Sequence, residues 1–238
     1  MYKYSPEEVK KIAVIGAGTM GPGIAQAFAM GGYIVDVWEP VEKNRELARV
    51  RVRDGVATSV SMGDIAPEEE AAVAGRVRFA DSLKAAVEDA QLIVECIVEK
   101  VDAKISLYTE LAALNKDAII ASNTSALNIF EVVPPELLDR QLIMHWYAPA
   151  QLVPLVEVVK SESAPQELIA PKSARTGIDL SVLRERSTLF VLNCIGRTLT
   201  DNLRAAAADY TVRLFTESAE AVPSGFCGIA EQRELAGQ

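Results

Sequence analysis

The feature that most constrains the fold of this chain is a cluster of glycines between an apolar segment and a helix-forming segment near the N-terminus. The apolar segment, KIAVI (residues 11–15), is a continuous run with β-branched residues, as in a strand that is covered on both faces. Gly16, Gly18 and Gly21 follow in the pattern GxGxxG, and the helix predicted after them stops at Gly31. A strand, a glycine turn and a helix in this order predict the first unit of a parallel α/β sheet.

Segments of strand and helix character alternate along the next part of the chain. We expect helices over roughly 41–60, 66–77 and 102–115, and strands within 33–40, 90–98, 117–122, 140–145 and 154–160. Strands that alternate with helices need crossover connections, which predict a Rossmann-type, doubly wound and mainly parallel sheet. We assign residues 1–182 to this domain and 183–238 to a shortened C-terminal helical region, with one long helix over 190–215.

Charge and cysteine content limit the classes of partner. The 238 residues carry a formal net charge of −9, whereas nucleic acids and anionic membranes require clustered lysines and arginines, so we expect neither as a partner. The three cysteines are scattered, without a CxxC pair or a Cys/His cluster, and predict neither a metal site nor a disulfide framework. The N-terminus lacks an apolar signal-like run and no segment has the length of a membrane span, which favours a cytoplasmic protein.

The glycine turn is suited to a pyrophosphate. The first glycine permits the tight turn, the second lets the pyrophosphate approach the backbone, and the third lets helix and strand pack closely. The bound anion then lies at the positive end of the helix. Thr19 and Met20 lie within the turn and join the glycines as candidate cofactor-binding residues.

An acidic residue indicates which dinucleotide the turn binds. Glu39 ends the second predicted strand about 20 residues beyond the turn, where the dinucleotide fingerprint places an acid. A carboxylate there accepts hydrogen bonds from the adenosine ribose hydroxyls and repels a 2′-phosphate, which favours NAD over NADP. The alternative interpretation makes Glu39 a solvated loop acid.

His145 is the sole histidine of the chain, and Glu157 follows it by twelve residues within another apolar run. Alone, each has an ordinary structural interpretation, as a polar residue at the edge of the core and as a solvated strand residue. Two strands joined by a bend can place residues at this spacing side by side. A carboxylate that accepts the proton of one imidazole nitrogen fixes the tautomer, so that the other nitrogen can take a proton from an alcohol. In a dinucleotide-binding domain, this pair predicts an alcohol dehydrogenation in which hydride passes to the nicotinamide.

A cluster of small polar residues, SNTS, follows the predicted strand within 117–122. Ligands of open α/β sheets bind beyond the carboxyl ends of the strands, so Asn123 and Ser125 are candidates to hold the nicotinamide ribose or a substrate oxygen. A helix cap or a turn would use the same residue types, and both interpretations stay open here.

These motifs together resemble the 3-hydroxyacyl-CoA dehydrogenase family. The resemblance extends from about residue 10 to 160 through IAVIGAGTMGPGIAQAFAMGG, IVECIVEKVDAK, IIASNTSALNI and IMHWYAPAQLVPLVEVVKSES. It implies oxidation of an L-3-hydroxyacyl-CoA by NAD to the 3-oxoacyl-CoA, with His145 and Glu157 as the catalytic pair. It leaves a homodimer open. It further implies substrate or cofactor contacts at Ser125, Glu39, Glu99, Lys104 and, in a segment similar to the start of the family's C-terminal helical domain, Asn193.

The chain departs from the family pattern at several positions. Ala148 stands where relatives have an asparagine three residues after the histidine, and the C-terminal segment has Thr188, Leu189 and Cys194 in place of Pro, Gly and Arg. The stretch VRVRDGVATSVSMGDIAPEEE (residues 50–70) contains no lysine for the phosphates of CoA. Two alternatives follow: a dehydrogenase of a free 3-hydroxy acid such as L-gulonate or carnitine, and an NAD-binding remnant without a complete substrate site.

Overall fold

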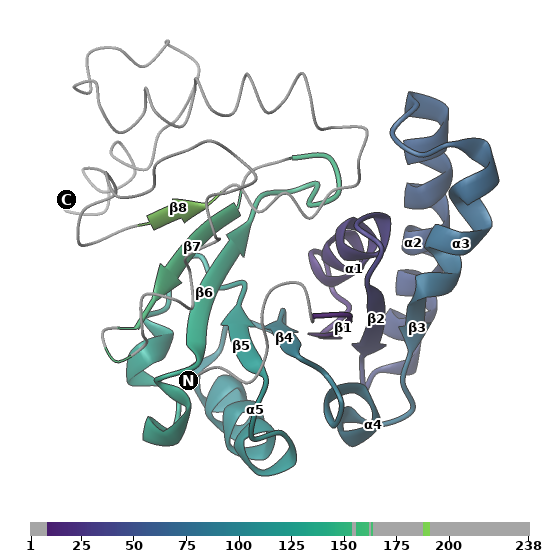
Figure 1. Cartoon of the computed structure of the whole chain (residues 1–238). Helices are drawn as coiled ribbons and strands as arrows, with labels where there is room; N and C mark the ends of the chain where they lie inside the picture. The colour runs from purple at the N-terminus through teal and green to yellow at the C-terminus, as the bar shows by residue number, and fades with distance from the viewer. Residues whose placement is uncertain (1–8, 154–155, 162, 164–187, 191–238) are drawn as a thin grey trace, which may run out of the picture.

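A single sheet organises the part of the chain that the computed structural model describes, which comprises residues 9–153, 156–161, 163 and 188–190. Its strands lie in the order β3-β2-β1-β4-β5-β6-β7-β8 (Figure 1). They are β1 Lys11–Ile15, β2 Ile34–Trp38, β3 Val77–Phe79, β4 Leu92–Glu95, β5 Ile119–Ser122, β6 Gln141–Trp146, β7 Val156–Lys160 and β8 Thr188–Phe190.

The helices are connections between these strands. The α-helices are α1 Gly21–Met30, α2 Glu42–Met62, α3 Glu70–Arg76, α4 Leu83–Val87 and α5 Val101–Leu114, and the short 3-10 helices are η1 Pro67–Glu69, η2 Ile129–Glu131 and η3 Pro135–Leu137. The strands from β3 to β6 pair in parallel, whereas β7 and β8 pair antiparallel. This arrangement confirms the predicted Rossmann-type, doubly wound and mainly parallel sheet.

The first strand shows why a continuous apolar run is needed. Ile12 and Val14 pack into a core that is shared with α1, α2 and α3. Ala13 and Ile15 point the opposite way, into a second core that is shared with α4 and α5. Figure 1 shows these two groups of helices on either side of β1 and β2. Because successive strand residues alternate between faces, a strand covered on both sides is apolar at nearly every position.

The structure adds elements that the sequence patterns did not predict. β3 has only three residues, too few for a recognisable pattern. An ion pair joins it to β2, in which Arg78 donates to both oxygens of the Asp36 carboxylate at 2.8 and 3.0 Å. The short helix α4 was also missed. Phe190, the predicted first residue of the long C-terminal helix, instead ends strand β8, while the rest of that helix, including Asn193 and Cys194, lies outside the described residues.

Candidate active site

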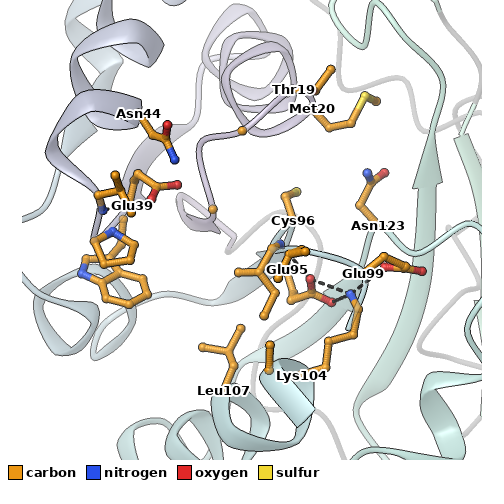
Figure 2. A pocket seen from close by; sticks show the side chains of 18 of the residues that line it. Thr19, Met20, Glu39, Asn44, Glu95, Cys96, Glu99, Lys104, Leu107 and Asn123 are labelled. Carbon is orange, nitrogen blue, oxygen red and sulfur yellow. Dashed lines mark hydrogen bonds and ion pairs between the residues drawn. The ribbon is translucent and has the colours of Figure 1, made fainter. Parts of the chain in front are cut away.

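A cavity of about 870 Å³ lies at the carboxyl ends of the parallel strands. It opens where the strand order reverses, since β1 leads to β2 on one side and to β4 on the other. Open α/β sheets bind ligands at such a switch point. The side chains and backbone around it are shown in Figure 2. The predicted cofactor-binding residues that line the cavity are Gly16, Gly18, Thr19, Met20, Glu39, Glu99, Lys104, Asn123 and Ser125.

The surroundings of the three glycines differ, and so does the effect that a side chain would have at each position. Gly16 has φ +97°, a conformation that favours glycine, and a Cβ there would come within 2.6 Å of the Cys96 carbonyl oxygen. A Cβ on Gly21 would lie 2.0 Å from the Gly16 carbonyl oxygen, so this glycine lets helix α1 approach the strand end. Gly18 has nothing within 4 Å of the corresponding point and faces the open cavity. The turn therefore packs tightly at its two ends and is open in its middle.

Glu39 holds the turn and lines the cavity at once. Its carboxylate accepts hydrogen bonds from the backbone N–H groups of Ala17 at 2.9 Å and Val41 at 3.0 Å. The side chain is largely buried, and it stands beside Asn44 at the end of the cavity shown on the left of Figure 2. Each carboxylate oxygen can accept more than one hydrogen bond, so these backbone contacts leave acceptor capacity for the hydroxyls of a ribose.

Glu99 and Lys104 form a charged pair at the other end of the cavity. Lys104 Nζ lies 3.1 Å from the Glu99 carboxylate, and Thr124 donates a further hydrogen bond to that carboxylate. Partial burial alone would raise the pKa of Glu99, but the Thr124 hydroxyl and the Lys104 ammonium together hold this pKa below its ordinary value. Glu99 therefore stays ionised and can accept hydrogen bonds at neutral pH.

Asn123 has a fixed orientation at the end of β5. Its side-chain oxygen accepts the backbone N–H of Trp146 at 2.9 Å, which ties it to strand β6. The amide nitrogen is left to face the cavity, toward Thr19 and Met20 (Figure 2). The SNTS cluster thus offers the cavity a hydrogen-bond donor whose direction is set by the neighbouring strand.

The register of β6 and β7 brings the two predicted catalytic positions together. His145 pairs with Glu157 across the antiparallel ladder, so the two residues lie opposite each other. His145 is partly buried, and its ring centroid lies 4.8 Å from that of Tyr147. It follows Ile143, which is level with Ser122 in the parallel pair of β5 and β6, so it lies at the same edge of the sheet as the cavity. His145 does not itself line the cavity of 870 Å³.

Several residues of the site carry no motif that would have revealed them. Glu95 ends β4, Cys96 follows it, and both line the cavity. Burial, followed by the nearby Glu95 charge, raises the pKa of the Cys96 thiol well above its ordinary value, so this cysteine stays protonated and is not a nucleophile. Further lining residues neighbour the motif residues in sequence, which is the only signal they give: Trp38, Pro40, Val41, Asn44, Ile97, Val98, Ala103, Ser106, Leu107 and Glu110.

A second cavity of about 470 Å³ adjoins the first, because Thr19 and Met20 line both. Arg51 of helix α2 lines this second cavity and donates a hydrogen bond of 2.7 Å to the Gly18 carbonyl oxygen. Gln151, which follows the cis peptide bond before Pro149, lines its opposite side. The second cavity thus joins the glycine turn to the loop between β6 and β7.

Known proteins with similar sequences and structures place the chain in a family. Residues 11–175 match the model of "3-hydroxyacyl-CoA dehydrogenase, NAD binding domain". The chain is 32% identical over 158 residues to a 3-hydroxybutyryl-CoA dehydrogenase of Mycobacterium tuberculosis, covering 65% of this chain and 55% of the relative. It is 36% identical over 161 residues to an L-carnitine dehydrogenase of Nocardiopsis dassonvillei, covering 66% and 47%. The chain thus spans about half the length of these relatives.

A solved structure agrees with these relatives. The crystal structure of 3-hydroxybutyryl-CoA dehydrogenase from Escherichia coli K12 superposes with a TM-score of 0.62 at 26% identity, covering 67% of this chain and 34% of that chain. Within the described residues, no helix has the length and apolar character needed to cross a membrane. The predicted cofactor, NAD, and the predicted oxidoreductase class agree with the family model and with the names of the relatives. This chain belongs to the 3-hydroxyacyl-CoA dehydrogenase family, and residues 11–175 match the family's NAD-binding domain.

Proposed function

We propose that this protein oxidises the 3-hydroxyl group of an L-3-hydroxyacyl-CoA to a 3-oxo group with NAD as the hydride acceptor. The observation that carries the proposal is the register of β6 and β7, which pairs His145 with Glu157 at the edge of the sheet where the cofactor cavity opens. Residues that are opposite in an antiparallel pair project from the same face of the sheet, and a carboxylate in that position would orient the imidazole for general-base catalysis on an alcohol.

The residues around the cavity have distinct roles in this proposal. The turn from Gly16 to Gly21 holds the pyrophosphate, Glu39 accepts the adenosine ribose hydroxyls, and Glu99 with Lys104 holds the nicotinamide ribose. Bound NAD supplies the acceptor for the hydride that leaves the 3-carbon. These assignments are supported by the lining of the cavity and by the family's NAD-binding domain.

In this proposal, side chains of the protein act on the hydroxyl group of the substrate. His145 takes the hydroxyl proton as the hydride leaves, so that the alcohol becomes a ketone and NAD becomes NADH. Ser125 and the Asn123 amide face the cavity and are placed to donate hydrogen bonds to the substrate oxygen or the nicotinamide end of the cofactor. The family pattern adds Asn193, which lies outside the described residues, as a further contact to the substrate oxygen.

The direct test follows NADH absorbance as the purified full chain acts on short and long L-3-hydroxyacyl-CoA thioesters and on free L-3-hydroxy acids. We expect the thioesters to drive NADH formation. NAD binding without turnover of any substrate would identify the chain as an NAD-binding remnant and would contradict the proposed activity.

A free 3-hydroxy acid is the second candidate substrate, and the second cavity favours it. Arg51 is the one cationic side chain that lines this cavity among the described residues, and residues 50–70 offer no lysine for the phosphates of CoA. One guanidinium matches a single carboxylate in charge and in hydrogen-bond geometry. Relatives named L-carnitine dehydrogenase, 36% and 33% identical to this chain, belong to the same set of matches.

Replacing Arg51 with alanine separates these two substrates. If a substrate carboxylate contacts Arg51, the KM of the free acid rises about 10-fold with a much smaller change in kcat, because a charge-assisted hydrogen bond is lost. Steady-state kinetics at saturating NAD measures both parameters. Arg49→Ala is the matched control, since Arg49 pairs with Glu46 on the same helix and neither residue lines the cavity. Equal effects of the two substitutions on KM would remove Arg51 from the substrate site.

Replacing Glu39 with alanine tests the choice of cofactor. We expect weaker binding of NAD and a smaller preference for NAD over NADP, because the variant loses the ribose acceptor and the charge that repels a 2′-phosphate. Calorimetric titration with both dinucleotides measures the change. Glu46→Ala removes the same charge from helix α2, where Glu46 pairs with Arg49 away from the cavity, and should leave the preference unaltered. An unchanged preference in the Glu39 variant would show that this carboxylate does not read the ribose.

A further inference from the structure

Glu95 is a fully buried carboxylate for which the proposed reaction has no direct use. Its exposed fraction is 0%, and both of its oxygens are occupied by donors. Lys104 Nζ lies 2.8 Å from Oε1 and 2.6 Å from Oε2. The Tyr108 and Ser122 hydroxyls donate to Oε2 at 2.8 and 2.5 Å, and the Ile97 backbone N–H donates to Oε1 at 2.8 Å.

The fold brings these donors together from two neighbouring elements. Lys104 and Tyr108 are four residues apart on α5 and therefore project from the same face of that helix. Ser122 ends β5 and is level with Glu95 in the parallel pair of β4 and β5. Burial, followed by the negative charge of Glu95, raises the pKa of Tyr108 well above its ordinary value, so its hydroxyl remains a donor. Glu95 is thus held rigidly at a strand end directly beneath the cavity.

Lys104 connects this buried carboxylate to the cavity rim. Its side chain is 1% exposed, and the same ammonium group that bonds Glu95 lies 3.1 Å from Glu99, whose side chain is 39% exposed. Figure 2 shows Glu95, Lys104 and Glu99 linked in this order beside the cavity. Lys104 therefore lies between two carboxylates, the buried one of Glu95 and the one of Glu99 at the rim of the cavity.

A buried ion pair of this kind is a poor source of net stability. Removing two charges from water costs about as much free energy as their attraction returns, so apolar replacements of similar volume are often equally stable. Glu95 gives the Lys104 ammonium group one fixed direction, which an apolar residue would not. Lys104 Nζ donates two short hydrogen bonds to the Glu95 carboxylate, and these fix it at the point where it also lies close to Glu99.

We propose that Glu95 is a positioning residue for the cofactor: it fixes the Lys104 ammonium beneath the cavity, and Lys104 in turn orients Glu99 toward the bound NAD. This inference rests on the proposed role of Glu99 and Lys104 in holding the nicotinamide ribose. Its consequence is that a residue 0% exposed, which acts on NAD through Lys104 and Glu99, controls the affinity for NAD.

The test compares two substitutions that remove different bonds from the same oxygen atoms. Glu95→Gln keeps the shape of the side chain but removes its charge and its hold on Lys104. Tyr108→Phe removes one hydrogen bond to Glu95 Oε2 and leaves the ion pair intact. We expect Glu95→Gln to raise the KM and the Kd for NAD roughly 10-fold, with a much smaller fall in kcat at saturating NAD, and Tyr108→Phe, which keeps the ion pair, to change the NAD affinity far less.

A double-mutant cycle keeps the inference testable if Glu95→Gln alone leaves Lys104 unpaired and does not fold. The double variant Glu95→Gln/Lys104→Met contains neither buried charge, and its NAD affinity should equal that of Lys104→Met, since Glu95 acts only through Lys104. A double variant that binds NAD markedly more weakly than Lys104→Met would overturn the inference, as would equal NAD affinities of Glu95→Gln and the unmodified protein. Failure of the unmodified protein to bind NAD would instead overturn the proposed function, so the two failures are distinguishable.

Discussion

Replacing His145 with glutamine is expected to lower kcat about 10²–10⁴-fold, the usual contribution of a positioned general base. Glutamine keeps a hydrogen-bonding side chain on β6 but cannot take the proton of the alcohol. Binding of NAD should not change, because His145 does not line the cofactor cavity. NADH absorbance measures turnover, and calorimetric titration of the same preparation measures the affinity for NAD.

Tyr147→Phe is the control for the aromatic surroundings of the histidine. Its ring contacts His145 with centroids 4.8 Å apart, and phenylalanine preserves that ring. We expect this variant to keep most of the activity. Turnover within a few-fold of the unmodified protein in His145→Gln would exclude the imidazole as the base and, with it, the catalytic pairing with Glu157.

The second large effect is expected at the glycine turn. One added methyl group should lower the free energy of unfolding at Gly16 and Gly21 but not at Gly18. Gly21→Ala places a carbon 2.0 Å from the Gly16 carbonyl oxygen, so the helix or the strand end must move. We expect a loss of about 1–3 kcal/mol in the free energy of unfolding, as for overpacked cores. Gly16→Ala should cost a similar amount, because it combines a close contact of 2.6 Å with φ +97°. Thermal or urea unfolding measures both.

Gly18→Ala separates folding from cofactor binding. A Cβ at this position meets nothing within 4 Å, so the free energy of unfolding should be unchanged. The new methyl group nevertheless occupies the place where the pyrophosphate approaches the backbone, and the affinity for NAD should fall at least 10-fold. A Gly18→Ala protein as unstable as Gly21→Ala, or one that binds NAD normally, would contradict this division of roles.

Much of the site was predictable because its residues stand next to strong local signals. The GxGxxG turn follows a strand that is apolar from Ile12 to Ile15, as expected for a strand covered on both faces. Glu39, Asn123 and Ser125 come directly after strand ends, and the carboxyl ends of parallel strands share one edge of a sheet. For these positions, sequence order alone implies a common location.

Other parts of the structure depend on contacts between segments that are distant in sequence. Strand β3 is too short to show a pattern, and the ion pair of Arg78 with Asp36 exists only once β3 lies beside β2. The burial of Glu95 depends on α5 and β5 closing over the end of β4. In the sequence, Glu95 is an acid inside the apolar run over residues 90–98, and no motif assigns it a buried ion pair.

The parallel α/β sheet, the glycine turn and the candidate residues His145 and Glu157 could be predicted from the sequence, because strand periodicity and glycine spacing are local properties of the chain. The opposition of His145 and Glu157 in the β6/β7 register, the position of Lys104 between Glu95 and Glu99, and the second cavity beside the first are known from the folded chain alone. Register and burial follow from the packing of whole elements against one another, and no short stretch of sequence encodes such packing.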